Sequence, residues 1–236
     1  MIVACIPTLY RPPTLQPLLD TLRDDGVATI VLETEGMEPR IYKWWNRMAD
    51  QARAQGATEI AILNDDIKIA RGTLPAMAEA MRFDPAVGLV CPGIGTPYLA
   101  PDIGLDPVAT CVPKRMYCCF PGWNFMFPAE LPVRFDEGYH WYGGDDAFEN
   151  DVRLAGYRVA GVRGVYADHL GSWSDKKRTA DAGNDPLLLT KERDHDYWET
   201  NKRLCPGWGW LSKQQRAWYA MTSEQRRAAQ KQVRYA

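Results

Sequence analysis

Two adjacent carboxylates, Asp145 and Asp146, are the residues of this chain with the clearest capacity for chemistry. A Gly-Gly pair precedes them, and His169 follows after one predicted helix and one predicted strand. Two carboxylates at the start of a helix, with a histidine nearby, can supply a general base beside a metal ion. A purely structural interpretation is equally open. Asp146 with Glu149 matches the capping box, in which such side chains bond the first backbone amides of a helix.

The segment after the acid pair predicts a short helix and then a strand. Phe148, Val152 and Ala155 recur at the spacing of one helical face, so we expect them to be buried. Gly156 stands where a left-handed glycine would end the helix. The run Tyr157–Ala167 is typical of a strand. This order places the acid pair at the start of a helix and the histidine after the next strand.

The composition indicates a globular protein. The 236 residues suffice for one large domain or one domain with an appendage, and a hydrophobic fraction of 46% provides a sizeable core. A net charge of −2 argues against a protein that holds nucleic acid on a basic face. The nine tryptophans suit the binding of sugars or other flat ligands, and burial in the core explains them equally well.

The six cysteines include no CxxC pair, so the sequence predicts no structural zinc site and favours a reducing compartment. Cys5 and Cys91 lie in apolar runs, where cysteine behaves as a small hydrophobic residue. No charged segment precedes the first apolar run, so we expect no signal peptide. No apolar run reaches the ~20 residues that span a bilayer, and we expect a cytoplasmic protein.

The first 92 residues alternate short apolar runs with amphipathic segments. The apolar runs predict strands at Ile2–Ile6, Ala28–Leu32, Glu59–Leu63 and Val87–Cys91. The amphipathic segments predict helices between Pro12-Pro13 and Gly26, at Ile41–Gln55 and at Thr73–Met81. This alternation is typical of α/β proteins with a mostly parallel sheet and helices on both faces.

Polar residues follow the predicted strands at their carboxyl ends. Thr8 follows the first strand, Glu33 the second, and Asn64, Asp65 and Asp66 the third. In parallel sheets, ligands bind in the crevice beyond these ends. We therefore expect the binding site at this edge of the sheet.

The pattern is less regular beyond residue 92. Residues 92–119 are rich in Gly and Pro, as in long loops that carry function. A strand is predicted at Phe120–Phe127, and helices at Leu187–Arg203 and over the basic tail Ser212–Ala236. A basic tail can lie on an anionic membrane, but we favour packing against its own domain, because its apolar residues cluster near the start.

Four segments carry a family resemblance when taken in order. They read IPTLYRPPTLQPLLDTL, AILNDDI, FPGWNFMF, and FDEGYHWYGGDDAFENDVRLAGYRV followed by HLGS. They resemble, in turn, the first strand and helix, the DxD region, the acceptor-side strand and the FDE…GED…R signature of the family-two nucleotide-sugar glycosyltransferases. That family has the GT-A fold. The resemblance covers roughly residues 2–173.

The chain departs from the family pattern at three places. Asn64 replaces the first acid of the DxD region, and Asp145-Asp146 replaces the family's Glu-Asp pair. The QxxRW motif of the processive synthases is missing, because the nearest string, Gln214–Trp218, lacks the arginine. The resemblance therefore favours transfer of a single sugar.

The resemblance implies roles for the chemical residues. Asp66 and His169 are the expected ligands of a divalent cation, and a histidine ligand favours Mn²⁺ over Mg²⁺. Asp146 is the expected catalytic base, and Asp145 helps to position it or the acceptor. A turn-capping carboxylate and a satisfied loop histidine are the structural alternatives for the two metal ligands.

The resemblance also implies residues that contact the two substrates. Those expected at the nucleotide-sugar donor are Pro7, Thr8, Arg11, Glu33, Asn64, Asp65 and Lys176. Those expected at the acceptor flank the acid pair and are Trp123, Asn124, Trp141 and Tyr142. Solvated strand ends and core packing explain such residues as well, so both interpretations stay open at this point.

We predict a GT-A-like α/β domain over residues 1–186, with a donor half at about 1–92 and an acceptor half at about 93–186. A helical extension would cover residues 187–236. The predicted activity is metal-dependent, inverting transfer of one sugar from a nucleotide diphosphate to the hydroxyl of a glycan, protein or small molecule. Two alternatives remain. One is a nucleotidyltransferase-like enzyme, which would require a glycine-rich loop after the first strand. The other is a non-catalytic nucleotide- or carbohydrate-binding module.

Overall fold

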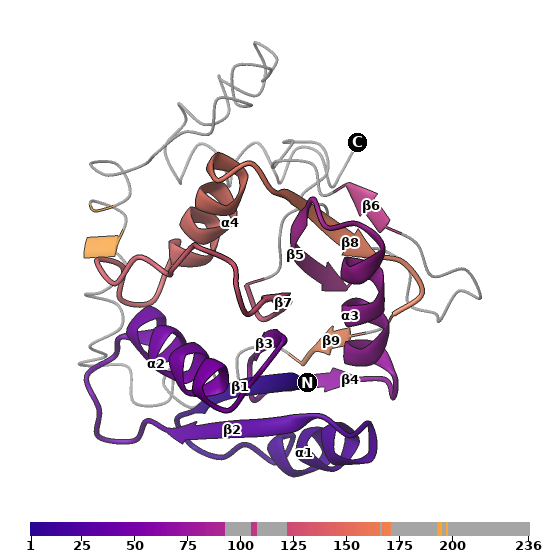
Figure 1. The fold of residues 1–236 in the computed structure, drawn as a ribbon. Helices are drawn as coiled ribbons and strands as arrows, with labels where there is room; N and C mark the ends of the chain where they lie inside the picture. The colour runs from indigo at the N-terminus through magenta and orange to yellow at the C-terminus, as the bar shows by residue number, and fades with distance from the viewer. Residues whose placement is uncertain (93–104, 108–121, 166, 171–192, 195–196, 198–236) are drawn as a thin grey trace, which may run out of the picture.

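The computed structural model describes residues 1–92, 105–107, 122–165, 167–170, 193, 194 and 197. They form an α/β fold in which a seven-stranded sheet separates two layers of helices (Figure 1). In order across the sheet, the strands are β2 (Ala28–Glu33), β1 (Ile2–Thr8), β3 (Glu59–Leu63), β7 (Asn124–Pro128), β5 (Val87–Pro92), β8 (Arg158–Val162) and β6 (Leu105–Pro107). All but β6 and β7 run in one direction, which confirms a mostly parallel sheet.

Two helices pack on each face of the sheet. One face carries α2 (Ile41–Ala54) and α4 (Gly144–Leu154), and the other carries α1 (Leu15–Asp24) and α3 (Thr73–Phe83) (Figure 1). Each helix buries the apolar stripe that its sequence predicts, although Ala155, expected on the buried face of α4, lies past its end and is exposed. The sheet unites the predicted donor and acceptor halves, because β7 and β8 are hydrogen-bonded among strands of the first 92 residues.

Strand β1 is central to the site because its whole length is enclosed. Residues Val3–Thr8 are buried, and the strand pairs in parallel with β2 on one side and β3 on the other. A parallel strand covered on both faces needs a continuous apolar run, which is what its sequence provides. The register pairs Thr8 with Glu33, so the ends of β1 and β2 lie level at one edge of the sheet.

Two antiparallel pairings bring later parts of the chain to this edge. β7 runs against β3, so its first residue, Asn124, lies opposite Leu63 at the end of β3. A small second sheet pairs β4 (Ile67–Ile69) with β9 (Ala167–His169) and sets His169 opposite Ile67. The sequence predicted neither β4 nor this sheet, and the single strand expected at Tyr157–Ala167 is wrong, because β8 and β9 divide it.

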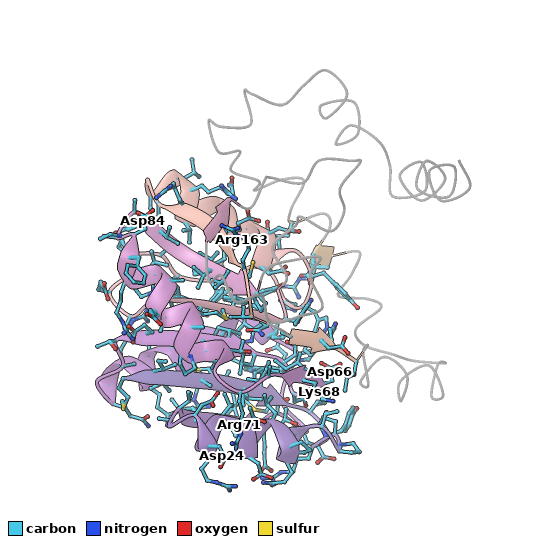
Figure 2. All side chains as sticks on the ribbon, turned by 90° about the vertical axis from the view of Figure 1, so that its right-hand side faces the viewer. Asp24, Asp66, Lys68, Arg71, Asp84 and Arg163 are labelled. Atoms are coloured by element: carbon cyan, nitrogen blue, oxygen red, sulfur yellow. The ribbon has the colours of Figure 1, made fainter. Side chains whose placement is uncertain are left out.

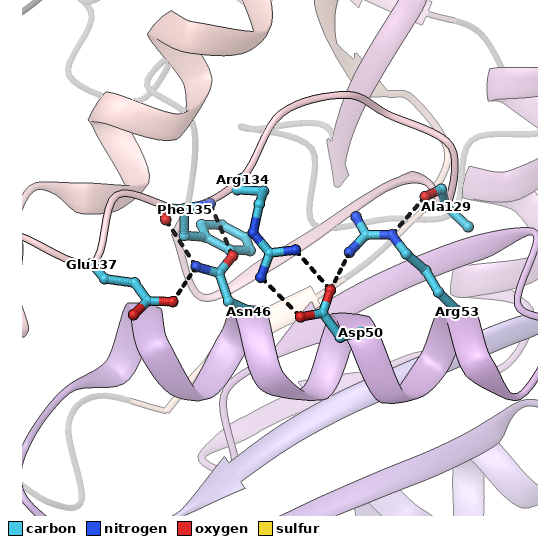
Figure 3. A network of polar contacts seen from close by, with 7 residues as sticks. All are labelled: Asn46, Asp50, Arg53, Ala129, Arg134, Phe135 and Glu137. Atoms are coloured by element: carbon cyan, nitrogen blue, oxygen red, sulfur yellow. Dashed lines mark hydrogen bonds and ion pairs between the residues drawn. The ribbon is translucent and has the colours of Figure 1, made fainter.

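Polar contacts tie α2 to the loop that leads into the acid pair (Figure 3). The side-chain amide of Asn46 donates to the Phe135 carbonyl and to Glu137, both at 2.9 Å, and its oxygen accepts from the Phe135 amide at 3.1 Å. Arg134 forms two bonds of 2.8 Å to the Asp50 carboxylate and lowers its pKa. The loop after β7 has no regular secondary structure, so these contacts hold it in place.

Several predicted features lie outside the described residues. They are most of the loop 92–119, the start of the strand at Phe120–Phe127, Lys176, the helix at Leu187–Arg203 apart from three residues, and the tail Ser212–Ala236. Within the part of the chain that the structure describes, no helix is long and apolar enough to cross a membrane. The helical extension and the cytoplasmic location stay predictions.

Candidate active site

The polar residues predicted at the strand ends do gather at one edge of the sheet. Figure 2 shows Asp66, which follows β3, at one edge, and Asp84, which precedes β5, at the opposite edge. Asn64 donates its backbone amide to the Trp123 carbonyl at 2.9 Å, so the residues after β3 and before β7 lie side by side. This edge of the sheet therefore brings together residues predicted to contact the nucleotide-sugar donor and residues predicted to contact the acceptor.

Asp66 and His169, the two predicted metal ligands, lie in direct contact although 103 residues separate them. The His169 Nε2 atom is 3.0 Å from Asp66 Oδ1, and the two side chains are 29% and 6% exposed. The Leu170 amide donates to the Asp66 carbonyl at 3.1 Å, which continues the β4–β9 pairing. The Trp123 ring stacks on the His169 imidazole, with the ring centroids 5.2 Å apart and an interplanar angle of 7°. This contact fixes the plane of the imidazole.

The Asp66 carboxylate and the His169 imidazole lie at hydrogen-bonding distance, 3.0 Å, and both are groups that can ligate a divalent cation. Among the described residues, no group of three or more His, Cys, Asp or Glu side chains could hold a metal. The described residues thus supply two donors, and a cation bound between them would need further ligands from a substrate or water.

Asp65 points to a different role from its neighbour. Burial raises the pKa of its carboxyl, and a hydrogen bond with Thr8 offsets part of that rise. Its carbonyl accepts from the Thr14 hydroxyl at 2.7 Å. These contacts tie the end of β3 to the loop after β1, so Asp65 shapes the donor side of the site.

A cavity of about 190 Å³ opens at this edge. Its lining residues are Pro7, Leu9, Thr34, Ile41, Trp44, Asn64, Asp65, Asp66, Trp141, Tyr142 and His169. The cavity thus has a polar wall at the ends of β1 and β3 and an aromatic wall from α2 and the loop before α4. Trp141, predicted at the acceptor, meets Trp44 edge-on at 6.0 Å.

Four of the residues that line the cavity were not predicted from the sequence: Leu9, Thr34, Ile41 and Trp44. Thr34 is buried, and its amide and hydroxyl both donate to the Thr8 carbonyl, at 2.9 and 3.1 Å. Trp44 and Trp45 are both buried in the same core cluster. Trp45 packs edge-on against Phe125 and Phe135, and Trp44 also lines the cavity.

Arg11 and Glu33, predicted to contact the nucleotide, lie just outside the cavity lining and form an exposed ion pair with each other. The Arg11 backbone, at φ 41°, adopts the left-handed conformation, and its amide donates to the Thr8 hydroxyl at 3.1 Å. A non-glycine residue held in this region indicates a constrained loop. Both side chains stand at the rim, where a nucleotide would have to compete with their mutual attraction.

The acid pair stands in the first turn of α4. The helix begins after Gly143, at φ 79°, and no side chain caps it. The capping-box interpretation is therefore wrong: Asp146 is not the N-cap, and Glu149 bonds Arg153 at 2.7 Å instead. Neither acid caps the helix with its side chain, and neither lines the 190 Å³ cavity.

The two acids of the pair differ in environment. Asp145 is half-buried, and Tyr42, whose raised pKa keeps it protonated, donates to its Oδ1 at 3.4 Å. Asp146 is exposed. Loss of hydration raises the pKa of both carboxyls, and the charges of Asp145 and Glu149 raise that of Asp146 further. Because Asp146 keeps contact with water, solvent screens part of its rise. A reachable carboxylate with a raised pKa is suited to general-base work.

Gly122 makes room for Asp145. A Cβ added at Gly122 would overlap the Asp145 carboxylate, so the side chain lies directly against this backbone. Gly122→Ala should therefore push the carboxylate out of place, lower the free energy of unfolding by about 1–3 kcal/mol, and reduce activity. Denaturant unfolding and a transfer assay measure the two effects.

A double-mutant cycle separates this contact from a general effect of alanine. In an Asp145→Ala background the overlap with the carboxylate is absent and only the contact with the Cβ atom at 2.8 Å remains, so Gly122→Ala should cost less stability there than in the wild-type chain. An equal cost in both backgrounds would show that the glycine serves the loop and not Asp145.

Asn124, predicted at the acceptor, is fully buried at the start of β7. Neither its amide nitrogen nor its oxygen has a hydrogen-bond partner within the described residues. A buried polar group of this kind requires an explanation, because leaving it unpaired is costly. Asn124 does not line the cavity, so the structure does not place it at a bound acceptor, and its position beside the end of β3 suits an enclosed water.

Comparisons with known proteins identify the fold. No family model matches the chain, and no curated protein sequence matches it. Among solved structures, it is similar to the mannosyltransferase PcManGT from Pyrobaculum calidifontis, in complex with GDP-Man and Mn²⁺. That match has a TM-score of 0.52 and 14% identity, and covers 88% of this chain and 66% of that chain.

S. aureus TarS 1-349, in complex with UDP-GlcNAc, is also similar, with a TM-score of 0.50 and 12% identity over 90% of this chain and 76% of that chain. At this level of identity the two similarities establish the fold and not the activity. The chain therefore has the GT-A-like α/β fold of glycosyltransferases.

Proposed function

We propose that this chain is a nucleotide-sugar glycosyltransferase that moves a single sugar to an acceptor hydroxyl with inversion, with the help of a divalent cation, Mn²⁺ before Mg²⁺. The observation that carries the proposal is the cavity at the strand ends. It gathers Asp66 and His169 with Asn64, Asp65 and an aromatic wall, although these residues are scattered through the chain. The structural relatives in complex with GDP-Man and UDP-GlcNAc support a nucleotide-sugar donor.

In this proposal, Asp66 and His169 hold the cation, which when bound neutralises the negative charge of the departing diphosphate. Pro7, Asn64 and Asp65 form the polar wall that orients the donor. The opposite wall of the cavity is formed by Trp44, Trp141 and Tyr142. Their aromatic faces can stack on a flat base or a sugar ring. Stacking excludes water and strengthens the polar contacts opposite.

The acid pair supplies the base. An acceptor hydroxyl is a weak nucleophile, and a carboxylate within hydrogen-bond reach accepts its proton as the attack proceeds. Asp146 is exposed and can meet an incoming acceptor, whereas Asp145 is held against Gly122 and Tyr42. Asp145 then fixes the geometry and its charge helps to raise the pKa of Asp146. Attack from the face opposite the diphosphate inverts the sugar.

A thermal-shift panel of nucleoside diphosphates, each with and without Mn²⁺, tests this function. A ligand that binds only the folded state, at about 100 times its Kd, stabilises by about 2.7 kcal/mol, or roughly 5–10 °C for a chain of this size. We expect such a shift for at least one nucleotide with Mn²⁺ and a smaller shift in EDTA.

The same panel, followed by an assay of sugar release and transfer, separates the alternatives. Binding without turnover on any acceptor would favour a non-catalytic module. Release of pyrophosphate from a nucleoside triphosphate and a sugar phosphate would favour a nucleotidyltransferase. No shift with any nucleotide would contradict all three.

A further inference from the structure

Asp194 makes three hydrogen bonds to a loop that lies more than 50 residues before it in the chain. Its Oδ1 accepts from the His140 amide at 2.8 Å, and its Oδ2 accepts from the Trp141 amide at 2.7 Å and the Tyr142 amide at 2.9 Å. The residue is 1% exposed. Consecutive backbone amides that converge form an anion-binding concavity, and here the anion belongs to the chain itself.

A second contact from the same segment reaches the same loop. The Tyr197 hydroxyl donates to both oxygens of Asp136, at 3.1 and 3.2 Å, and its ring meets Tyr139 edge-on at 4.8 Å. A Cβ added at Gly138 would overlap the Tyr197 ring, so the two pack without a gap. Asp194 and Tyr197 together thus contact the loop from Asp136 to Tyr142.

Other contacts of the loop involve its carbonyls: His140 O accepts from the Ile41 amide at 2.8 Å, and Trp141 O accepts from the Tyr42 hydroxyl at 3.2 Å. The three amides are bonded by the Asp194 carboxylate. The loop forms neither helix nor strand between β7 and α4, so no backbone ladder pairs these amides. Both residues line the cavity, and the acid pair follows after only Gly143 and Gly144. Bonds from amides to a charged carboxylate are stronger than bonds between neutral groups, and a buried carboxylate holds its partners firmly.

We propose that Asp194 is a positioning residue of the active site, which holds the backbone of His140–Tyr142 so that Trp141 and Tyr142 form the wall that receives the nucleoside diphosphate. The inference rests on the proposed function and extends it to a part of the chain beyond the GT-A-like core. Asp194, together with Tyr197, is then part of the site and not of an appendage to it.

Hydrogen exchange tests the contact without reference to activity. In the wild-type full-length chain, the amides of His140, Trp141 and Tyr142 should exchange slowly. Asp194→Asn keeps one acceptor oxygen but replaces the other by an NH₂ group, which cannot accept. At least one of the three amides should then exchange about 10- to 100-fold faster, while α2 amides such as Met48 keep their rates.

Titration with UDP and with GDP, each with Mn²⁺, tests the positioning role. For the nucleotide that binds the wild-type chain, Asp194→Asn should weaken the affinity for that nucleotide about 10- to 100-fold. This is the usual effect of replacing a residue that orients the groups in contact with a bound species. In a transfer assay, KM for the donor should rise more than kcat falls. The matched control is Asp20→Asn, a partly exposed aspartate that bonds Gln16 and Arg23 on its own helix α1, and it should change neither quantity.

The outcomes separate the two claims. Fast exchange of the three amides in the wild-type chain would overturn the contact, and this holds even if the variant fails to fold. Unchanged nucleotide affinity in a folded Asp194→Asn chain would overturn the positioning role alone. If the wild-type chain binds neither nucleotide, the proposed function falls and the positioning role falls with it.

Discussion

Asp146→Asn is expected to reduce turnover by roughly 10²- to 10⁴-fold, the usual contribution of a general base, while the fold stays intact. The amide has nearly the same shape as the carboxylate but cannot take the acceptor's proton. The helix does not depend on this side chain for its cap, because α4 begins after Gly143 without a side-chain bond. Loss of a first-turn charge costs about 0.3–1 kcal/mol, and relief of repulsion from Asp145 and Glu149 offsets it.

The pH dependence gives an independent measure. The pKa of the folded Asp146 carboxyl is raised, so the base is ionised only above this raised value, and transfer should increase as the pH rises through it. The stability of the folded chain should change in the opposite sense. The unfolded state has the lower pKa, so the pair contributes more stability as the pH falls through the raised value. Because Asp145 and Asp146 interact, they titrate together, and both pH dependences report the titration of the pair.

Asp20→Asn is the control, since it makes the same chemical change at a partly exposed site on α1. Stability is compared by denaturant unfolding and turnover by sugar transfer at saturating donor. A near wild-type rate in Asp146→Asn would assign the base elsewhere, and Asp145→Asn is then the next variant to measure. Strong destabilisation of Asp146→Asn would indicate a structural role instead.

His169→Phe is expected to weaken Mn²⁺-dependent binding of the nucleoside diphosphate by at least about 10- to 100-fold, the range found even for residues one shell away from a metal. Phenylalanine keeps a planar ring against Trp123 but removes the nitrogen that lies 3.0 Å from Asp66. Asp66→Asn should have a similar effect, because an amide oxygen is a weaker ligand than a carboxylate. EDTA should abolish transfer in the wild-type chain, and Mn²⁺ should restore it.

Binding in EDTA is the internal control for this pair of variants. If Asp66 and His169 act through a cation, the variants and the wild-type chain should bind the nucleotide equally weakly without metal. A loss of affinity that persists in EDTA would mean that the pair contacts the nucleotide directly or only supports the β4–β9 sheet. Full transfer activity in chelator would contradict the metal altogether.

Sequence patterns predicted the elements of the first 92 residues, apart from β4, to within a few positions. β3 was predicted at its observed bounds, Glu59–Leu63, and α2 was predicted one residue longer than observed. These elements bury one regular apolar face or run, so local periodicity carries the information. The same reasoning predicted that polar residues would meet at the strand ends, because parallel strands share one edge.

Periodicity failed where a short element depends on a distant partner. β4 and β9 are three residues each, and each exists because the other pairs with it. The capping box around Asp146 failed for a related reason. The pattern of side chains was correct, but Gly143 adopts a left-handed backbone and starts the helix earlier. Local sequence does not distinguish these outcomes, since their energies differ by only about 1 kcal/mol.

The residues that form the cavity wall, and the contacts that hold it, depend on tertiary packing. Trp44 and Trp45 are neighbours in sequence and both are buried in one core cluster, yet Trp44 also lines the cavity. Asp194 carries no motif and no period, and its partners are backbone amides, which every residue except proline possesses. A bond from a carboxylate to backbone amides across 50 residues leaves no trace in the identity of its partners, so folding alone reveals it.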